Sequence, residues 1–227
     1  ALWDILSKKN VSKNSYILLP DFYCLDVEKN IKLHGYKVAT YKILDNLEAD
    51  KKDFKNKIKE IKPTVIVVFH PVGITSNLFD SASWLKHTTG KSLLIEDSVH
   101  KIVDSSKVKI IKKNHFVIDS LRKVVPVQGS NVYGNSEDLN FSAPKFFESF
   151  TYKIKVYFLW LLMEISWSVK LFALAEKLMV VGYNLIGDSE KSASGFAIAG
   201  MLAKRVDSNK IAKIKKHQAL IYESKLG

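Results

Sequence analysis

A chain of 227 residues, of which 47% are hydrophobic, can bury a core, so a wholly disordered protein is excluded. The single cysteine, Cys24, excludes an internal disulfide and fits a reducing compartment, so we expect a cytoplasmic protein. The net charge of +12 favours anionic ligands, but the lysines are dispersed, and neither a nucleic-acid-binding pattern nor metal-ligand spacing occurs.

The first two-thirds of the chain alternate between helical patterns and short apolar runs. Helices are expected at residues 1–9, 22–33, 53–61 and 81–88. Strands are expected at residues 16–20, 37–44, 64–69, 92–95, 115–118 and 131–133. This alternation predicts a three-layer α/β fold, in which a mainly parallel sheet carries helices on both faces.

The last third has helical patterns and no strand signal. We expect a helical segment at residues 144–186 and a break at Gly187. A small-residue helix at 191–204 and a basic helix at 209–225, capped by Asp207, complete the chain. Three parts follow from this pattern: a large domain at residues 1–140, a connecting helical segment at 141–186 and the start of a small domain at 187–227.

The helical segment at residues 152–181 is strongly apolar, but charges such as Glu164 and Lys170 interrupt it. These charges exclude an apolar run that is long enough to span a membrane. A helix that lies on a membrane surface stays open as an alternative, because Trp160 and Trp167 have lysines nearby. We favour burial of this segment against a missing domain or a partner subunit.

Polar side chains follow three of the expected strands. His70, Asp97 and Lys123 each come shortly after a different apolar run. Because right-handed crossovers place the carboxyl ends of parallel strands along one edge, we expect these residues at the same edge of the sheet. Ligands of open α/β sheets bind at that edge.

An amine and a carboxylate at such an edge are what pyridoxal phosphate (PLP) requires. Lys123 is the candidate for the Schiff base, and Asp97 is the candidate that keeps a proton on the pyridine nitrogen. Ser120, one turn before Lys123, is placed to hydrogen-bond a phosphate, and His100 is close enough to Asp97 to reach the same ring. The alternatives stay open: a surface lysine, a capping or loop aspartate and an ordinary partly buried histidine.

Three further residues at this edge have two interpretations each. His70 lines the floor of the pocket, or it belongs to a turn without a chemical role. Phe22 and Tyr23 stack on a cofactor ring, or they pack in the core of a helix. The sequence contains no G-x-S-x-G elbow, no P-loop and no G-x-G-x-x-G, which removes support for a hydrolase or a dinucleotide-binding protein.

Five motifs follow one another in a recognisable order. They are Leu18-Leu19-Pro20-Asp21-Phe22-Tyr23, the helix end at Gly35, Phe69-His70-Pro71-Val72-Gly73, Glu96-Asp97-Ser98-Val99-His100 and Ser120-Leu121-Arg122-Lys123. Over residues 1–135 this order resembles the large domain of fold-type-I PLP enzymes, and most closely the DegT/DnrJ/StrS-type sugar aminotransferases. The resemblance implies Asp97 at the pyridine nitrogen, His100 near the phenolic oxygen, Ser120 at the phosphate and Lys123 as the Schiff base.

The sequence also departs from that family. Relatives carry a phosphate-binding turn just before the first Ala-Leu helix, and here the chain starts at Ala1, so we expect a fragment without that turn. The glycine-rich stretch after the lysine is reduced to Gln128-Gly129-Ser130. The run Arg122-Lys123-Val124-Val125-Pro126 is closer to divergent relatives of unknown substrate.

The resemblance implies a PLP-dependent aminotransferase that works as a homodimer. An amino donor and a small-molecule acceptor, a keto-sugar nucleotide, are the expected partners. One alternative is a degenerate protein of the same fold that binds a partner or a membrane surface through its apolar helix. Another is a different fold-type-I reaction, such as decarboxylation or a retro-aldol step, because a lysine and an aspartate serve all of these.

Overall fold

A six-stranded sheet forms the centre of the computed structural model, which describes residues 1–121, 130–139, 146–187 and 207–226. The strand order is β2-β1-β3-β4-β5-β6, in which β1 to β5 are parallel and β6 is antiparallel. The strands are β1 (Tyr16–Pro20), β2 (Lys37–Tyr41), β3 (Val65–Phe69), β4 (Leu93–Asp97), β5 (His115–Ile118) and β6 (Val132–Tyr133). The predicted α/β class with a mainly parallel sheet is confirmed.

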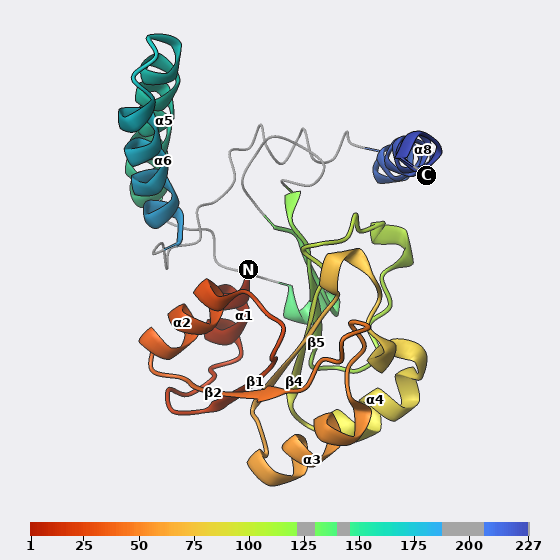
Figure 1. Cartoon of the computed structure of the whole chain (residues 1–227). Helices are drawn as coiled ribbons and strands as arrows, with labels where there is room; N and C mark the ends of the chain where they lie inside the picture. The colour runs from red at the N-terminus through yellow and green to blue at the C-terminus, as the bar shows by residue number, and fades with distance from the viewer. Residues whose placement is uncertain (122–129, 140–145, 188–206, 227) are drawn as a thin grey trace.

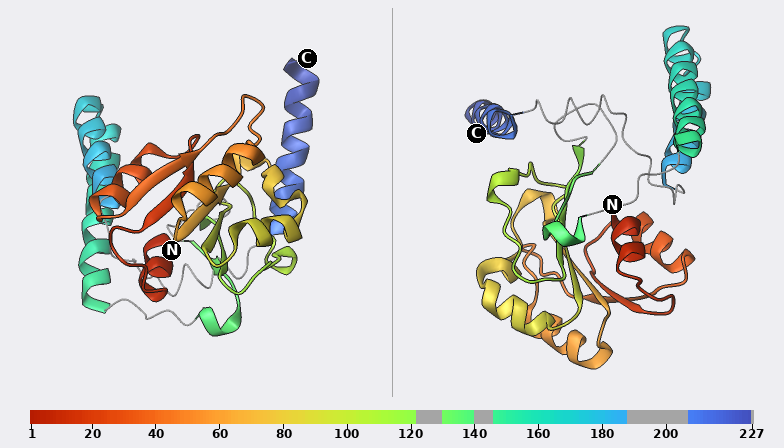
Figure 2. Two further views of the ribbon diagram at one scale, coloured as in Figure 1. Left: turned by 90° about the horizontal axis from the view of Figure 1, so that it is seen from below. Right: turned by 180° about the vertical axis from the view of Figure 1, so that it is seen from behind.

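Four helices cover the two faces of this sheet (Figures 1 and 2). They are α1 (Leu2–Lys8), α2 (Leu25–Leu33), α3 (Lys51–Ile61) and α4 (Ala82–Thr89). One core cluster joins α1 and α2 to the odd-numbered residues of β3, and the other joins α3 and α4 to its even-numbered residues. Every residue of β3 is buried, which explains why its sequence is almost purely β-branched and aromatic.

The winding of the chain reverses between β1 and β3. From β1 the chain passes through α2 to β2 on one side, and it then returns through α3 to β3 on the other side of β1. Neighbouring strands whose connections leave in opposite directions form a topological switch point, with a crevice outside their carboxyl ends. The segments that follow Pro20 and Phe69 therefore border this crevice.

Local signals explain where the helices begin and end. Asp50 caps α3 by accepting hydrogen bonds from the backbone of Lys52 and Asp53, and Lys62 ends the helix in a left-handed conformation with φ of 49°. The α2 helix starts at Leu25, three residues later than the sequence pattern predicted. The difference arises because residues 21–24 form the turn that leaves β1.

The connection from β4 to β5 differs from the other crossovers. Over the described residues 98–114 it contains a single short 3-10 helix, η3 (Ser105–Lys107), and no α-helix. It is held partly by Lys112, whose ammonium donates to Thr89 Oγ1, to the carbonyl of Gly90 and to the carbonyl of Ser92 at 2.7–3.1 Å. No helix was predicted from the sequence in this stretch either.

The last third forms helices, as predicted, but the segment at 144–186 is not one uninterrupted helix. It consists of α5 (Phe146–Ser168) and α6 (Phe172–Gly187), which pack against each other as a hairpin. At the turn Lys170 has φ of 62°, and the backbone N–H of Leu171 donates to the carbonyl of Ser166. This Schellman-type ending reverses the chain without the glycine that would have marked it in the sequence.

The final helix, α8 (Ser208–Leu226), begins one residue before the predicted start at 209. Asp207 caps it as predicted, because Asp207 Oδ1 accepts a hydrogen bond from the backbone of Lys210 at 3.0 Å. The predicted helix at 191–204 lies outside the described residues. None of the helices in the described ranges is long and apolar enough to cross a membrane. The division into a large domain, a connecting segment and a small domain stays a prediction.

Candidate functional site

The candidate site lies at the carboxyl ends of β3 and β4. Asp97 is the last residue of β4 and pairs in register with Phe69, the last residue of β3. Side chains alternate between the faces of a strand, so Asp97 shares a face with Ile95, and Phe69 shares the same face with Val67. Since Val67 and Ile95 belong to the core cluster under α1 and α2, Asp97 faces that side of the sheet.

Asp97 is a buried carboxylate with two donors. Its exposed fraction is 4%. Its Oδ2 accepts a hydrogen bond from the Tyr23 hydroxyl at 2.5 Å, and its Oδ1 accepts one from the backbone of Val99 at 3.0 Å. Burial raises the pKa of Asp97 despite these hydrogen bonds, because the charged form loses hydration. The site thus presents a carboxyl group whose position is fixed by two hydrogen bonds. A positively charged neighbour would stabilise its ionised form.

Three aromatic rings line this position across the switch point. The ring of Tyr23, which follows β1, meets the ring of Phe69 edge to face at a centroid distance of 5.3 Å. The same Phe69 ring meets the imidazole of His100 at 4.8 Å. Burial raises the pKa of Tyr23 well above its ordinary value, and the Asp97 charge adds to that shift, so the hydroxyl remains a donor.

The loop after β4 is held against the turn after β3. The turn η1 (Pro71–Gly73) places Gly73 at φ of 86°, and a Cβ at that position would lie 3.1 Å from the carbonyl oxygen of His100. Only glycine allows both the conformation and the close approach. This contact fixes the backbone of His100, whose exposed side chain lies beside Phe69.

His70 does not join this group. Its imidazole is fully buried on the opposite face of the sheet, the face covered by α3 and α4. Neighbouring residues of a strand point to opposite faces, so His70 and Phe69 diverge although they are adjacent in sequence. The predicted role of His70 at the floor of the cofactor pocket is therefore not supported by its position.

His70 instead belongs to a polar cluster with Glu96 and His115, in which both imidazoles are fully buried. Glu96 Oε1 lies 2.8 Å from His70 Nε2, and Glu96 Oε2 lies 3.3 Å from His115 Nε2. Each imidazole accepts a backbone N–H at Nδ1, from Ser76 and Ile111 respectively. Both Nε2 atoms therefore carry the proton. His70 Nε2 donates to Glu96 Oε1, whereas His115 Nε2 lies near Glu96 Oε2 without the geometry of a hydrogen bond.

The electrostatics of Glu96 follow from these two imidazoles. Burial alone would raise its pKa, but the interactions with His115 and His70 outweigh burial and lower the pKa to about 2. Glu96 is thus ionised while its sequence neighbour Asp97 resists ionisation. The sequence motif Glu96-Asp97 splits into two groups with separate tasks, one on each face of the sheet.

The remaining predicted residues are placed only in part. Phe22 is half exposed and precedes Tyr23 in the turn after β1. Ser120 is partly buried and follows Asp119, which binds β5 to β6 through hydrogen bonds from Asn131. Lys123 lies outside the described residues. The structure thus brings Asp97, Tyr23 and His100 together around Phe69, whereas Ser120 lies at the end of a neighbouring strand.

Phe69 is the site residue that the sequence analysis missed as a functional candidate. Its signal was present, because Phe69 ends the most apolar run and lies two residues from Val67 on the same strand face. A pattern based on strand ends alone does not reveal which residues share a face. The parity of positions along β3 and β4 would have paired Phe69 with Asp97 and Glu96 with His70.

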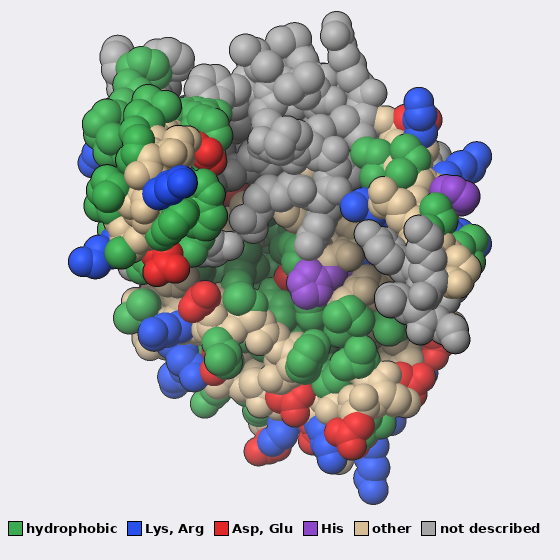
Figure 3. All heavy atoms as spheres, turned by 45° about the horizontal axis from the view of Figure 1, so that its top comes forward, with side chains coloured by type: hydrophobic (Ala, Val, Ile, Leu, Met, Phe, Trp, Pro, Cys, Tyr) green, Lys and Arg blue, Asp and Glu red, His purple; other side chains and the backbone are tan. Residues whose placement is uncertain are grey.

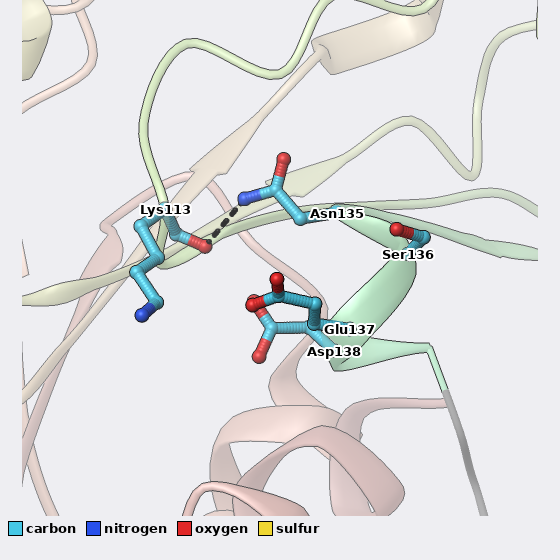
Figure 4. A pocket seen from close by; sticks show the side chains of 5 residues that line it. All are labelled: Lys113, Asn135, Ser136, Glu137 and Asp138. Atoms are coloured by element: carbon cyan, nitrogen blue, oxygen red, sulfur yellow. Dashed lines mark hydrogen bonds between the residues drawn. The ribbon is translucent and has the colours of Figure 1, made fainter.

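A separate shallow pocket of about 380 Å³ lies at the other end of β5 (Figure 4). Its lining residues are Lys113, Asn135, Ser136, Glu137 and Asp138. The side chain of Lys113 and the carboxylates of Glu137 and Asp138 point into the same space. Because Lys113 precedes β5 while Asp97 ends β4, this pocket lies at the opposite edge of the sheet and is not the site described above.

Neither a protein-family model nor a curated protein matches this sequence. Among solved structures, the chain is similar to the PLP-bound C-S lyase from Staphylococcus hominis, with 15% identity, 61% of this chain covered, 41% of that chain covered and a TM-score of 0.48. It is also similar to histidinol-phosphate aminotransferase from Clostridium acetobutylicum, with 18% identity, 60% and 43% coverage and a TM-score of 0.45.

A third similar structure is alanine aminotransferase from Pyrococcus furiosus, with 18% identity, 58% of this chain covered, 37% of that chain covered and a TM-score of 0.45. The chain thus spans between 37% and 43% of the length of these three proteins. All three TM-scores lie below 0.5, so the fold assignment rests on the strand order of the chain itself.

Proposed function

We propose that this chain acts in a PLP-dependent enzyme of the aminotransferase type. The observation that carries the proposal is the buried Asp97 carboxylate at the switch-point edge, beside the rings of Tyr23, Phe69 and His100. A protonated pyridine nitrogen is stabilised by a buried carboxylate, and a planar ring is held by aromatic side chains. An open α/β sheet binds its ligands at this edge.

The donors and acceptors present at Asp97 are compatible with that cofactor. Oδ2 accepts one hydrogen bond from Tyr23, and a carboxylate oxygen can accept a second one. Burial raises the pKa of Asp97, so a cationic N–H at this position would restore the charged form. Asp97 would hold the proton of the pyridine nitrogen, while Tyr23 keeps the carboxylate oriented.

We also propose roles for the other residues of the site. PLP, when bound, supplies an electron sink for the bond that is broken at the substrate α-carbon. Lys123 is the amine that binds the cofactor aldehyde and then moves a proton at that carbon. Ser120 donates to the phosphate, and His100 lies near the phenolic oxygen. Phe69, and with it Tyr23 or Phe22, limits the ring to one plane.

We further propose an amino donor and a keto-sugar nucleotide as the acceptor, with a homodimer as the working form. The net charge of +12 supports an anionic acceptor of this kind. The single cysteine, Cys24, is exposed and has no second cysteine to pair with in the chain, which fits the reducing cytoplasm where we place the protein. Decarboxylation and retro-aldol chemistry use the same lysine and aspartate and remain the alternative reactions.

The direct test of this proposal is reconstitution with PLP, followed by visible absorption. We expect a bound chromophore near the violet edge of the visible spectrum in the wild type and its loss in Lys123→Ala. Lys101→Ala is the matched control, since Lys101 is a partly exposed lysine in the loop after His100 and its ammonium donates to Thr75 Oγ1. Equal chromophore binding by both variants would contradict the assignment of Lys123.

A second candidate function, a catalytically degenerate binding protein of the same fold, is favoured by one observation. The Tyr23 hydroxyl lies within 2.5 Å of the Asp97 oxygen that the cofactor would use. If this contact closes the site, Tyr23→Phe should bind PLP at least about tenfold more tightly than the wild type. If Tyr23 orients Asp97 for the cofactor, the same substitution should weaken PLP binding, as measured by absorption titration.

A further inference from the structure

The α5–α6 hairpin presents large apolar side chains to its surroundings. They are Phe158, Trp160, Leu161, Ile165 and Trp167 on α5, and Phe172, Leu174, Met179, Val180 and Val181 on α6, each with an exposed fraction between 46% and 59%. Figure 3 shows hydrophobic side chains over most of the visible surface of this hairpin, with a few charged groups among them. Such a surface requires a partner that removes it from water.

The apolar residues surround the hairpin and do not form a single stripe. On α5 the exposed Phe158 and Trp160 point about 200° apart, because each residue of an α-helix turns by about 100°. The face between the two helices is marked by Ser166 and Ala175, with exposed fractions of 5% and 1%. A helix that is apolar on all sides is found in the interior of a large protein or in lipid.

We propose that the α5–α6 hairpin binds the surface of a membrane that contains anionic lipids, with its apolar side chains inserted among the acyl chains. A second protein would cover one side of the hairpin and leave the opposite side in water. A single leaflet surrounds the outward sides of the hairpin, with acyl chains on one side and lipid headgroups on the other. Trp160 and Trp167 fit this environment, because tryptophan concentrates at the boundary between acyl chains and headgroups.

The polar groups within the hairpin agree with a lipid environment. Ser166 Oγ donates to the carbonyl of Leu162 at 2.7 Å, and Ser168 Oγ donates to the carbonyl of Glu164 at 2.8 Å. These hydroxyls are satisfied inside their own helix, as surroundings without water require. The small buried residues Ser166 and Ala175 allow the two helices to approach closely.

The depth of insertion is limited by charge. Glu164, Lys170, Glu176 and Lys177 are exposed along the hairpin, and neither helix qualifies as a membrane span. The hairpin therefore lies in the headgroup region and the adjoining acyl chains, with these charges directed toward the headgroups. This arrangement associates the protein with one leaflet.

Charge complementarity selects anionic lipids. The sequence has a net charge of +12. The exposed lysines of the hairpin and its turn include Lys155, Lys170 and Lys177. Basic residues next to an interfacial segment are attracted to the negative surface potential of an anionic leaflet. This proposal is independent of PLP binding.

The test is flotation of the 227-residue chain with vesicles of phosphatidylcholine alone and of equimolar phosphatidylcholine and phosphatidylglycerol. We expect strong binding to the anionic vesicles, at least tenfold weaker binding to the neutral ones and a decrease with added salt. The double variant Leu161→Glu with Ile165→Glu should lose vesicle binding at least tenfold. The matched control is Leu25→Glu with Leu33→Glu, two exposed leucines at the ends of α2, and it should bind like the wild type.

The four tryptophans supply a second readout that does not depend on a charge substitution. Trp3 and Trp84 pack against the two core clusters of the sheet, whereas Trp160 and Trp167 lie on the hairpin. Brominated lipids should quench the fluorescence of Trp3→Phe with Trp84→Phe as strongly as they quench the wild type. Quenching should vanish in Trp160→Phe with Trp167→Phe.

Three results would overturn the proposal. One is the absence of vesicle binding, and another is equal binding by wild type and the Leu161→Glu, Ile165→Glu variant. The third is a mass of two chains by light scattering that depends on the hairpin and is accompanied by no vesicle binding, which would assign the surface to a second copy. Binding of equal strength to neutral and anionic vesicles would contradict the proposed preference for anionic lipids.

Discussion

Two adjacent carboxylates of β4, Glu96 and Asp97, have opposite electrostatics. The pKa of Glu96 is lowered to about 2 by two imidazoles, whereas burial raises the pKa of Asp97. The cause is the alternation of side chains along a strand, which directs Glu96 to the face under α3 and α4 and Asp97 to the face under α1 and α2. Glu96 therefore stabilises the fold, while the raised pKa of Asp97 supports its proposed role beside a cationic ring nitrogen.

Replacement of Glu96 by Gln should destabilise the protein. Since the pKa of Glu96 falls from 4.5 to about 2 on folding, its ionised form contributes about 3 kcal/mol of stability above pH 4.5. The wild type should lose this contribution as the pH falls from 4.5 toward 2. We expect Glu96→Gln to unfold at a lower urea concentration than the wild type at pH 7. Its stability should also decrease less than that of the wild type as the pH falls from 4.5 toward 2.

The control for this substitution is Glu60→Gln, which changes an exposed residue of α3 that pairs with Lys57 at 3.5 Å. Exposed pairs of this kind contribute about 0.2–1 kcal/mol at most. A loss of stability in Glu96→Gln that is no larger than the loss in Glu60→Gln would show that the cluster of Glu96 with His70 and His115 does not stabilise the fold.

Asp97→Asn should have the opposite effect on stability. Because the pKa of Asp97 is higher in the folded protein than its ordinary value of 3.8, the wild type loses stability as the pH rises from 3.8 through the folded pKa. The neutral amide removes this loss. We expect Asp97→Asn to be at least as stable as the wild type at pH 7 by urea unfolding, and to bind PLP at least about tenfold more weakly.

Asp119→Asn provides the comparison. Asp119 is also buried, but it accepts three hydrogen bonds, two from Asn131 and one from Tyr133. Its replacement should lower the stability at pH 7, because a donating NH2 group takes the place of one of the two accepting carboxylate oxygens. Destabilisation of both variants to the same extent would argue that Asp97, like Asp119, is a structural residue.

At the scale of elements, the site depends on contacts between turns that leave separate strands. The turn η1 after β3 supports the loop after β4 through Gly73 and His100, and Tyr23 in the turn after β1 reaches Asp97 at the end of β4. These contacts join the carboxyl ends of three strands around the switch point. The geometry of these contacts determines whether the aromatic rings and the Asp97 carboxylate line the same space.

Gly73→Ala tests this support. The new Cβ would lie 3.1 Å from the His100 carbonyl at a φ of 86°, so strain and a shifted loop should cost about 1–3 kcal/mol. Gly35→Ala is the matched control, since Gly35 has φ of 83° and the nearest side-chain atom to its Cβ lies at 3.8 Å. We expect Gly73→Ala to lose more stability than Gly35→Ala in urea unfolding, and equal losses would contradict the role of the close contact.

At the scale of the whole molecule, the three-layer fold followed from the sequence because its strands are short apolar runs bounded by turn residues. The run Val65–Phe69 is an example, since burial on both faces leaves no polar position in it. Asp97 was placed correctly at the end of its strand for the same reason. Periodicity therefore located the elements and the edge of the sheet where the site lies.

Other features did not follow from the sequence. The turn at Lys170 was missed, because a left-handed lysine carries no sequence signal of the kind that glycine provides. His70 was grouped with Asp97 because both follow strands. Since odd-numbered and even-numbered positions of β3 and β4 face opposite sides of the sheet, the two side chains lie on different faces. The role of Phe69 depends on the register between β3 and β4, which is a tertiary property. Lys123 as the PLP lysine stays a prediction.

The most direct test of the central claim is reduction of the PLP-treated chain with borohydride, followed by mass mapping of the modified peptide. The proposed function requires the pyridoxyl group on Lys123, and its yield should fall strongly in Asp97→Asn. A label spread over other lysines such as Lys101 and Lys113, with the same yield in Asp97→Asn, would contradict the assignment of this edge of the sheet as a PLP site.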